Sequence, residues 1–195
     1  MAIQVASGGF AGAVVPRNET EGGIMLDTKM QDAINEQINW ELYSGYLYLS
    51  MAAQFSEMGM SGGQNWMTVQ YQEELAHAQK MFDYVTTRGG RVTLEAIAKP
   101  QTEWAGGLDM FKEALAHEEK VTARIFDLAS LALEIKDHAS YNFLQWFIAE
   151  QVEEEESAND MVQKFSMAGD QPAGLYQLDK ELAVRVFTPP APAGG

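Results

Sequence analysis

The chain has 195 residues, 46% of them hydrophobic, which is enough for one substantial core or two small ones. It contains no cysteine, which excludes disulfides, thiolate zinc sites and cysteine-ligated iron–sulfur clusters and fits a reducing compartment. With 13 basic and 28 acidic residues the net charge is −15, so the chain should repel nucleic acid and attract cations, although solubility alone is an equally good explanation of that charge.

The two ends of the chain differ from its middle. Residues 2–15 are mildly apolar, but no Lys or Arg precedes them and glycines interrupt them, which disfavours a signal peptide. We expect a flexible extension at 1–24, with Met25 as the natural start of one folded domain at 25–187. The tail at 188–195, TPPAPAGG, cannot continue a helix and is expected to be flexible. No apolar run reaches the length of a membrane span, so no membrane partner is expected.

Five segments show the 3.6-residue hydrophobic period of a helix that buries one face. The first is expected at 28–56, and its inward stripe reads Ile34, Ile38, Glu41, Gly45, Tyr48 and Ala52. The second, at 62–88, should begin at a capping box of Ser61 and Gln64 and stop at Gly89-Gly90. Its inward stripe reads Gln70, Glu74, His77, Met81 and Tyr84.

The remaining three helices follow a long irregular segment. The third helix is expected at 108–135, with the stripe Phe111, Leu115, Glu118, Thr122, Ile125, Ala129 and Leu133. The fourth, at 138–167, should be capped by Asp137 and ended by Gly169, and its stripe reads Phe147, Gln151, Glu154, Ala158, Met161 and Phe165. A short fifth helix at 174–186 carries Leu175, Leu178, Leu182 and Val186.

The connections between these helices predict the topology. Short loops join the first helix to the second and the third to the fourth, so each pair should be antiparallel. Residues 90–106 show no clear period and contain Pro100. Fully extended they reach about 55 Å, whereas a helix of this length spans about 42 Å. The segment can therefore cross the whole bundle. The fold class is all-α: a four-helix bundle with a long crossover between helices two and three, plus a short fifth helix.

Acidic residues interrupt the apolar stripe of each of the four long helices. They are Glu41, Glu74, Glu118 and Glu154, and His77 follows Glu74 by three positions on the same helix face. All lie near mid-helix, so they can meet at one level of the bundle. Buried carboxylates are costly unless they are paired or bind a metal. The pattern indicates a carboxylate-bridged di-iron site, whose oxygen and imidazole ligands suit Fe(II).

Each of these residues also has a plainer interpretation when it is taken alone. Glu41 can be a solvent-facing acid and Tyr48 an ordinary core tyrosine. The run of four glutamates at 153–156 is typical of a solvated helix face. His117 and His138 are taken as surface or structural residues. The agreement of depth and spacing between four helices favours the metal site.

Five stretches of the chain resemble the prokaryotic non-haem ferritins. They are NEQINWELYSGYLYLSM at 35–51, EELAH at 73–77, HEEKVT at 117–122, FLQWFIAEQVEEE at 143–155 and GLYQLDKEL at 174–182. The resemblance covers residues from Met25 to about Val186. It implies the ferritin-like fold and makes 25–187 a ferritin-like di-iron domain.

The resemblance also implies a role for each site residue. Glu41, Glu74 and His77 would hold a first iron, Glu74 would bridge to a second iron bound by Glu118, and Gln151 would lie beside the pair. Tyr48 would be a hydrogen-bond partner and electron donor next to the centre. A third, more outward iron would be held by Glu73, Glu150, Glu153 and Glu154, the last also reaching the di-iron centre.

Differences from related families narrow the assignment. Bacterioferritins have a second Glu-x-x-His pair where this chain has Gln151 and Glu154, and their haem-binding Met would lie at Leu75 or Ala76, so no haem is expected. Rubrerythrins need cysteines that are missing here. The DNA-protecting mini-ferritins lack a fifth helix, and this chain has no basic tail for nucleic acid.

The function that the resemblance implies is that of a cytoplasmic ferritin. Such a protein is a ferroxidase: it oxidises Fe(II) with dioxygen and stores the ferric mineral in a hollow homo-oligomeric shell, a 24-mer. Two alternatives remain. A shell subunit without fast oxidation would lose the ligands that this chain keeps, and a di-iron oxidase acting on an organic substrate usually needs a second histidine ligand.

Overall fold

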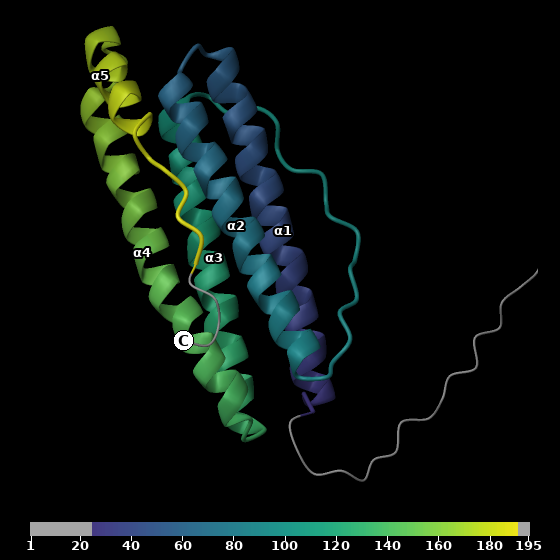
Figure 1. Cartoon of the computed structure of the whole chain (residues 1–195). Helices are drawn as coiled ribbons and strands as arrows, with labels where there is room; N and C mark the ends of the chain where they lie inside the picture. Colours follow the sequence, from purple (N-terminus) through teal and green to yellow (C-terminus); the bar gives the residue numbers. More distant parts are fainter. Residues whose placement is uncertain (1–24, 191–195) are drawn as a thin grey trace, which may run out of the picture.

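The computed structural model describes residues 25–190, and all five expected helices are present in it (Figure 1). The predictions for residues 1–24 and for most of the tail lie outside the described residues. The helices are α1 (Thr28–Glu57), α2 (Ser61–Thr87), α3 (Gly107–Glu134), α4 (His138–Ala168) and α5 (Pro172–Leu182). Among the described residues no helix is long and apolar enough to cross a membrane.

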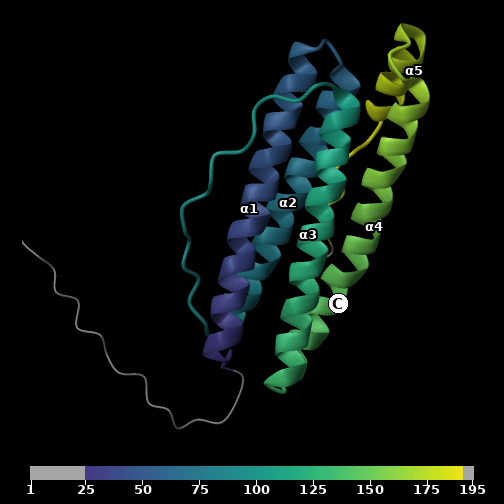
Figure 2. The same ribbon diagram turned by 180° about the vertical axis from the view of Figure 1, so that it is seen from behind.

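The long helices form a four-helix bundle with the predicted crossover. α1 and α2 are antiparallel neighbours, as are α3 and α4, and residues 88–106 run along the outside of α1 from one end of the bundle to the other (Figures 1 and 2). Side chains of α1 hold this segment at intervals. Asn35 Nδ2 donates to the carbonyl of Arg91 at 3.0 Å, and Gln54 Nε2 donates to the carbonyl of Trp104 at 2.7 Å. The crossover is therefore fastened to α1 along its length.

Local signals explain several helix ends. Asp137 caps α4 by accepting from the backbone N–H of Ser140 at 3.0 Å, as predicted. α2 stops before Gly89, which has φ of 69°, and α4 stops at Gly169, which has φ of 53°. Both glycines have a positive φ, a backbone conformation that glycine adopts without the steric penalty of a Cβ.

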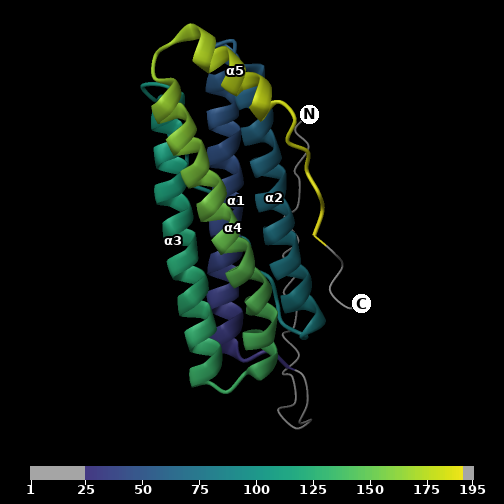
Figure 3. The same cartoon turned by 90° about the vertical axis from the view of Figure 1, so that its left-hand side faces the viewer.

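The predicted capping box at the start of α2 is wrong. Ser61 is the first helical residue, Met60 occupies the cap position, and no local side chain caps the helix. A residue from α5 takes over this role, since Asp179 Oδ1 accepts from the backbone N–H of Gly63 at 2.9 Å. Figure 3 shows α5 lying across this end of the bundle. The fifth helix therefore completes the start of the second.

Two other details differ from the sequence-based expectation. Leu133 of α3 is 49% exposed, and the buried face extends beyond the predicted stripe on one side. It keeps the predicted Phe111, Glu118, Ile125 and Ala129 and adds Ala114, Val121, Leu128 and Ala132. The helix is therefore rotated slightly relative to the predicted stripe. α5 begins two residues earlier than expected and ends at Leu182 rather than 186, which leaves Val186 exposed beyond it.

The core consists of two apolar clusters with a polar layer between them. Near α5, Phe55, Phe111 and Phe165 pack together, and at the other end Ile34, Val85 and Ile125 belong to the second cluster. The middle of each long helix contributes buried polar side chains instead, which are Glu41, Ser44, Gln70, Glu74, His77, His117, Glu118, Gln151 and Glu154. The candidate site occupies this central layer.

Candidate metal centre

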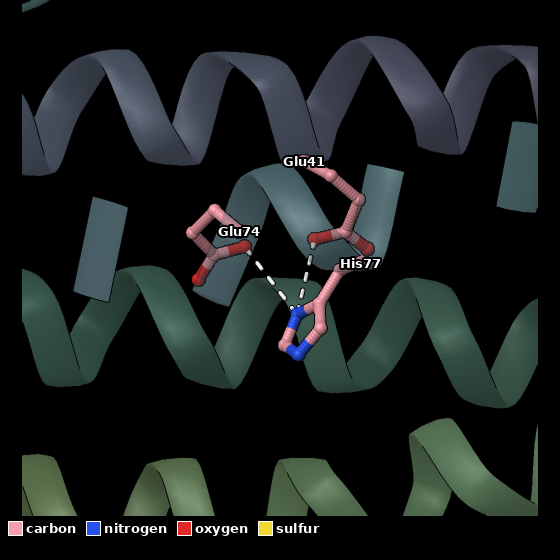
Figure 4. A group of neighbouring side chains, drawn as sticks. All are labelled: Glu41, Glu74 and His77. Atoms are coloured by element: carbon pink, nitrogen blue, oxygen red, sulfur yellow. Dashed lines mark ion pairs between the residues drawn. The ribbon is translucent and has the colours of Figure 1, made fainter. Parts of the chain in front are cut away.

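Three ligand-bearing side chains converge in the central layer. Glu41 comes from α1, and Glu74 and His77 come from successive turns of α2 (Figure 4). His77 Nδ1 lies 4.0 Å from Glu41 Oε2 and 3.7 Å from Glu74 Oε2. One ligand atom from each residue lies within 4.8 Å of the others, and all three side chains are buried. The solvent-facing interpretation of Glu41 is therefore wrong.

Two oxygens of this group lack a hydrogen-bond partner. Glu41 Oε2 and Glu74 Oε2 are buried and accept no hydrogen bond, although buried carboxylate oxygens are normally satisfied. Such atoms are destabilising unless a cation or donor meets them. Both point toward His77 Nδ1, so two carboxylates and an imidazole face one another. This donor set fits a divalent first-row metal such as Fe²⁺.

Glu118 lies beside these ligands on α3. It accepts a hydrogen bond from the Tyr48 hydroxyl and another from Gln151 Nε2 at 3.1 Å. Burial and the negative charge of Glu154 raise the pKa of Glu118 to about 8, against the opposing effect of its two donors. Burial raises the pKa of Tyr48 well above its usual value, with the charge of Glu118 as the next cause. Tyr48 and Gln151 thus orient one carboxylate.

The acids of the centre act on one another electrostatically. Burial raises the pKa of Glu74, and the charges of Glu118 and then Glu41 raise it further. Glu154 raises the pKa of both Glu74 and Glu118. Carboxylates in a low-dielectric interior that disfavour one another's ionisation create a strong demand for a positive charge. The structure therefore brings the predicted inner residues into one electrostatic unit.

The four acids predicted to hold an outward iron are, as a group, less buried than the inner ligands. Glu73 forms an ion pair with Arg185, and its pKa is raised to about 7 because burial and the charges of Glu154 and Glu150 outweigh the arginine. Glu150 is half-buried, and burial raises its pKa. Glu153 is exposed. The structure thus places Glu73 and Glu154 inward and leaves Glu153 at the surface.

Two glutamines that the sequence analysis did not assign hold the ligands in place. Gln37 Nε2 donates to Glu41 Oε1 at 2.9 Å, and Gln70 Nε2 donates to Glu154 Oε2 at 2.6 Å. Gln37 is itself held by Arg124 Nε at 2.8 Å. Both glutamines lie one helical turn before a predicted ligand, on the same face. That four-residue spacing was a signal for the bond of Gln37 to Glu41, whereas Gln70 bonds Glu154 of α4 and no local spacing indicates it.

His117 is an interior residue rather than a surface one. Its Nε2 lies 2.7 Å from Ser44 Oγ, and its ring stacks on Trp40 at a centroid distance of 5.9 Å. Burial and the charge of Lys120 lower the pKa of His117 to about 4, so the imidazole is neutral near pH 7. It packs α1 against α3. His138 is exposed at the start of α4.

A groove between α3 and α4 reaches the polar layer from outside. Its volume is about 590 Å³, and its acidic lining includes Glu119, Glu155 and Glu156. Gln151 also lines this groove, while its amide donates to Glu118. One side chain thus borders both the groove and the centre.

Comparisons with known proteins agree with this geometry. The family model of the ferritin-like domain matches residues 31–168. A bacterial non-heme ferritin of Staphylococcus saprophyticus is 39% identical over 163 residues, which cover 84% of this chain and 98% of that protein. A bacterial non-heme ferritin of Bacteroides fragilis is 42% identical over 161 residues, covering 83% of this chain and 100% of that protein.

Solved structures give the same result. An open-pore ferritin from the hyperthermophilic archaeon Archaeoglobus fulgidus matches with a TM-score of 0.83 at 52% identity, covering 84% of this chain and 100% of that chain. A closed form of that ferritin, engineered by site-directed mutagenesis, matches with a TM-score of 0.83 at 54% identity and covers 84% of this chain. The resemblance that the motifs indicated is confirmed, and the chain belongs to the ferritin family, among the prokaryotic non-haem ferritins.

Proposed function

We propose that this protein is a ferroxidase and an iron store. It oxidises Fe(II) with dioxygen at a centre formed by Glu41, Glu74, His77 and Glu118, and it keeps the ferric oxo-hydroxide product inside a hollow shell. The observation that carries the proposal is the pair of unpartnered, buried oxygens of Glu41 and Glu74 that face His77 Nδ1. Ferrous iron is the substrate and supplies the electrons that dioxygen takes up.

Each residue of the centre has a defined task. Glu41, Glu74 and His77 bind the first Fe(II), and Glu74 and Glu118 bind the second, with Glu74 between the two. Gln37 orients Glu41, and Tyr48 with Gln151 orients Glu118. Because burial raises the pKa of Glu118 to about 8, this carboxyl holds a proton near pH 7 in the metal-free protein and releases it when a cation arrives, and burial raises the pKa of Glu74 in the same direction.

The path of the substrate and the form of the assembly are part of the same proposal. The acidic groove between α3 and α4 concentrates cations near Gln151, which borders Glu118. Glu73, Glu150, Glu153 and Glu154 form the outward third iron position.

The subunits form a closed homo-oligomer, a 24-mer, and the protein works in the cytoplasm. Light scattering of the purified protein tests the stoichiometry.

The direct test is the initial rate of aerobic Fe(II) oxidation at about two irons per subunit, the loading of a di-iron site. The wild type is compared with Glu74→Ala, and Glu134→Ala serves as a matched control because Glu134 is an exposed acid at the end of α3, outside the acidic groove. We expect fast oxidation in the wild type and in Glu134→Ala, and the rate of buffer in Glu74→Ala with assembly intact.

Other outcomes select the alternatives. Equal, slow rates in all three proteins would make a passive storage shell the better description. Loss of assembly in Glu74→Ala would give Glu74 a structural role instead.

A further inference from the structure

The segment after α5 returns along α2 and forms a C-terminal strap, defined as residues 183–190 (Figure 3). Asn65 Nδ2 on α2 donates to the backbone carbonyl of Leu182 at 3.3 Å and to that of Arg185 at 2.9 Å. The guanidinium carbon of Arg185 lies 4.3 Å from the centre of the Trp66 ring. The beginning of the strap is therefore held in a defined position against α2.

In this position the guanidinium of Arg185 lies next to the outward acids. Its Nη1 donates to Gln70 Oε1 at 2.7 Å, and its Nη2 donates to Glu73 Oε2 at 2.5 Å. Gln70 in turn donates to Glu154 Oε2 at 2.6 Å. One guanidinium therefore binds Glu73 directly and holds Glu154 through a single amide. An arginine keeps its charge at every physiological pH, so the positive charge beside Glu73 is always present.

The inner and outer acids differ in this respect. Among the described residues, the oxygens of Glu41 and Glu74 that face His77 accept no hydrogen bond. One oxygen of Glu73, Oε2, is already bonded to the positive charge of Arg185. A metal ion entering the inner group meets free oxygens, whereas a metal ion that binds Glu73 meets a competitor of the same sign.

We propose that Arg185 is a built-in competitor for the outward cation position, which a metal ion occupies only by displacing the guanidinium and the strap from Glu73. The inference rests on the proposed function, because it takes the inner group as the tight cation site. Arg185 is then the residue that sets the order in which metal ions bind: they occupy the inner positions first and the outer position last. Withdrawal of the strap would also free Gln70 from Arg185 while leaving its bond to Glu154.

The test is a calorimetric titration of the metal-free assembled protein with Zn²⁺, a redox-inert probe that takes the same kinds of ligand. In the wild type we expect tight binding at the inner group and weak binding at the outer position. Arg185→Ala should bind the outer Zn²⁺ about tenfold or more tightly, the effect of losing a competing charge-assisted hydrogen bond. The inner affinity should not change.

Three controls accompany this variant. Lys164→Ala removes the same charge from a pair with Glu181 at the junction of α4 and α5, and it should leave the outer affinity unchanged. Arg185→Lys keeps the charge but loses the fork that reaches two partners, so its outer affinity should be intermediate. Adding Glu73→Gln to Arg185→Ala should abolish the tightened binding.

A crystal of the wild type soaked in Zn²⁺ gives a second readout that does not need a variant. We expect anomalous density beside Glu73 only where the guanidinium of Arg185 has moved away. Zn²⁺ bound to Glu73 with Arg185 still in place would overturn the inference, as would unchanged or weaker outer binding in Arg185→Ala. Absence of tight inner binding in every protein would instead refute the proposed function.

Discussion

The clearest prediction about pH concerns Glu118. The folded protein disfavours the ionised form of this buried carboxyl, so the free energy of unfolding should depend on pH. In the unfolded chain this group titrates near 4.5, and in the folded, metal-free protein burial and the charge of Glu154 raise its pKa to about 8. The protonated carboxyl of Glu118 therefore contributes its full stabilisation at pH values below 4.5. This stabilisation is lost as the pH rises from there through about 8.

The magnitude follows from the two pKa values. Each unit of difference corresponds to about 1.4 kcal/mol, so Glu118 taken alone would cost the metal-free protein about 5 kcal/mol at alkaline pH. Glu118→Gln replaces the carboxyl with a neutral group of the same shape that can still accept from Gln151. The variant should therefore gain stability relative to the wild type as the pH rises.

The assay is denaturant unfolding of metal-free protein at about pH 5 and about pH 8, at one subunit concentration because the proposed assembly would make stability depend on concentration. We expect the free-energy difference between Glu118→Gln and the wild type to grow by several kcal/mol over this range. Glu119→Gln, which changes an exposed neighbour, should follow the wild type. Parallel pH dependence in the wild type and Glu118→Gln would refute the reasoning.

Two further predictions concern the fold. Gly107→Ala should destabilise the protein by about 1–3 kcal/mol, because a Cβ there would lie 2.4 Å from the ring of Phe165. Gly106→Ala, with no atom within 4 Å of its Cβ, should cost less, and equal thermal unfolding midpoints for the two variants would contradict this packing argument. Asp137→Ala should cost about 1–2 kcal/mol by removing the cap of α4 and the ion pair with Arg88, and a thermal midpoint unchanged from the wild type would show that neither contact matters.

The sequence predicted the four long helices to within one residue at each end, because an apolar stripe with a period of 3.6 residues is a local signal. It also predicted which acids share a level of the bundle. Glu41, Glu74 and His77 meet in the structure as that depth argument required. Their role as iron ligands stays a prediction that the oxidation assay tests, and the division of the chain at 24 and 187 also stays a prediction.

Predictions were wrong where the deciding partner is distant in the chain. The sequence predicted a capping box at the start of α2, but Asp179 of α5 supplies the cap. The residues around Ser61 contain no information about a partner more than a hundred residues away. Leu133 was predicted on the buried face of α3 but is exposed, because the rotation of a helix about its axis depends on how it packs against its neighbours. Arg185 was expected inside the fifth helix at 174–186, but α5 ends at Leu182 and the contacts of Arg185 are made with distant residues of α2.

The helices, their antiparallel pairing and the family could be predicted from the amino-acid sequence, since periodicity, loop length and motifs are properties of the chain alone. How the charges of the site are satisfied became visible in the folded structure. There the inner oxygens of Glu41 and Glu74 accept no hydrogen bond, whereas the outer Glu73 is paired with the guanidinium of Arg185. The reason is physical: burial and pairing depend on which side chains of remote segments come to lie within a few ångströms, and no local pattern encodes those distances.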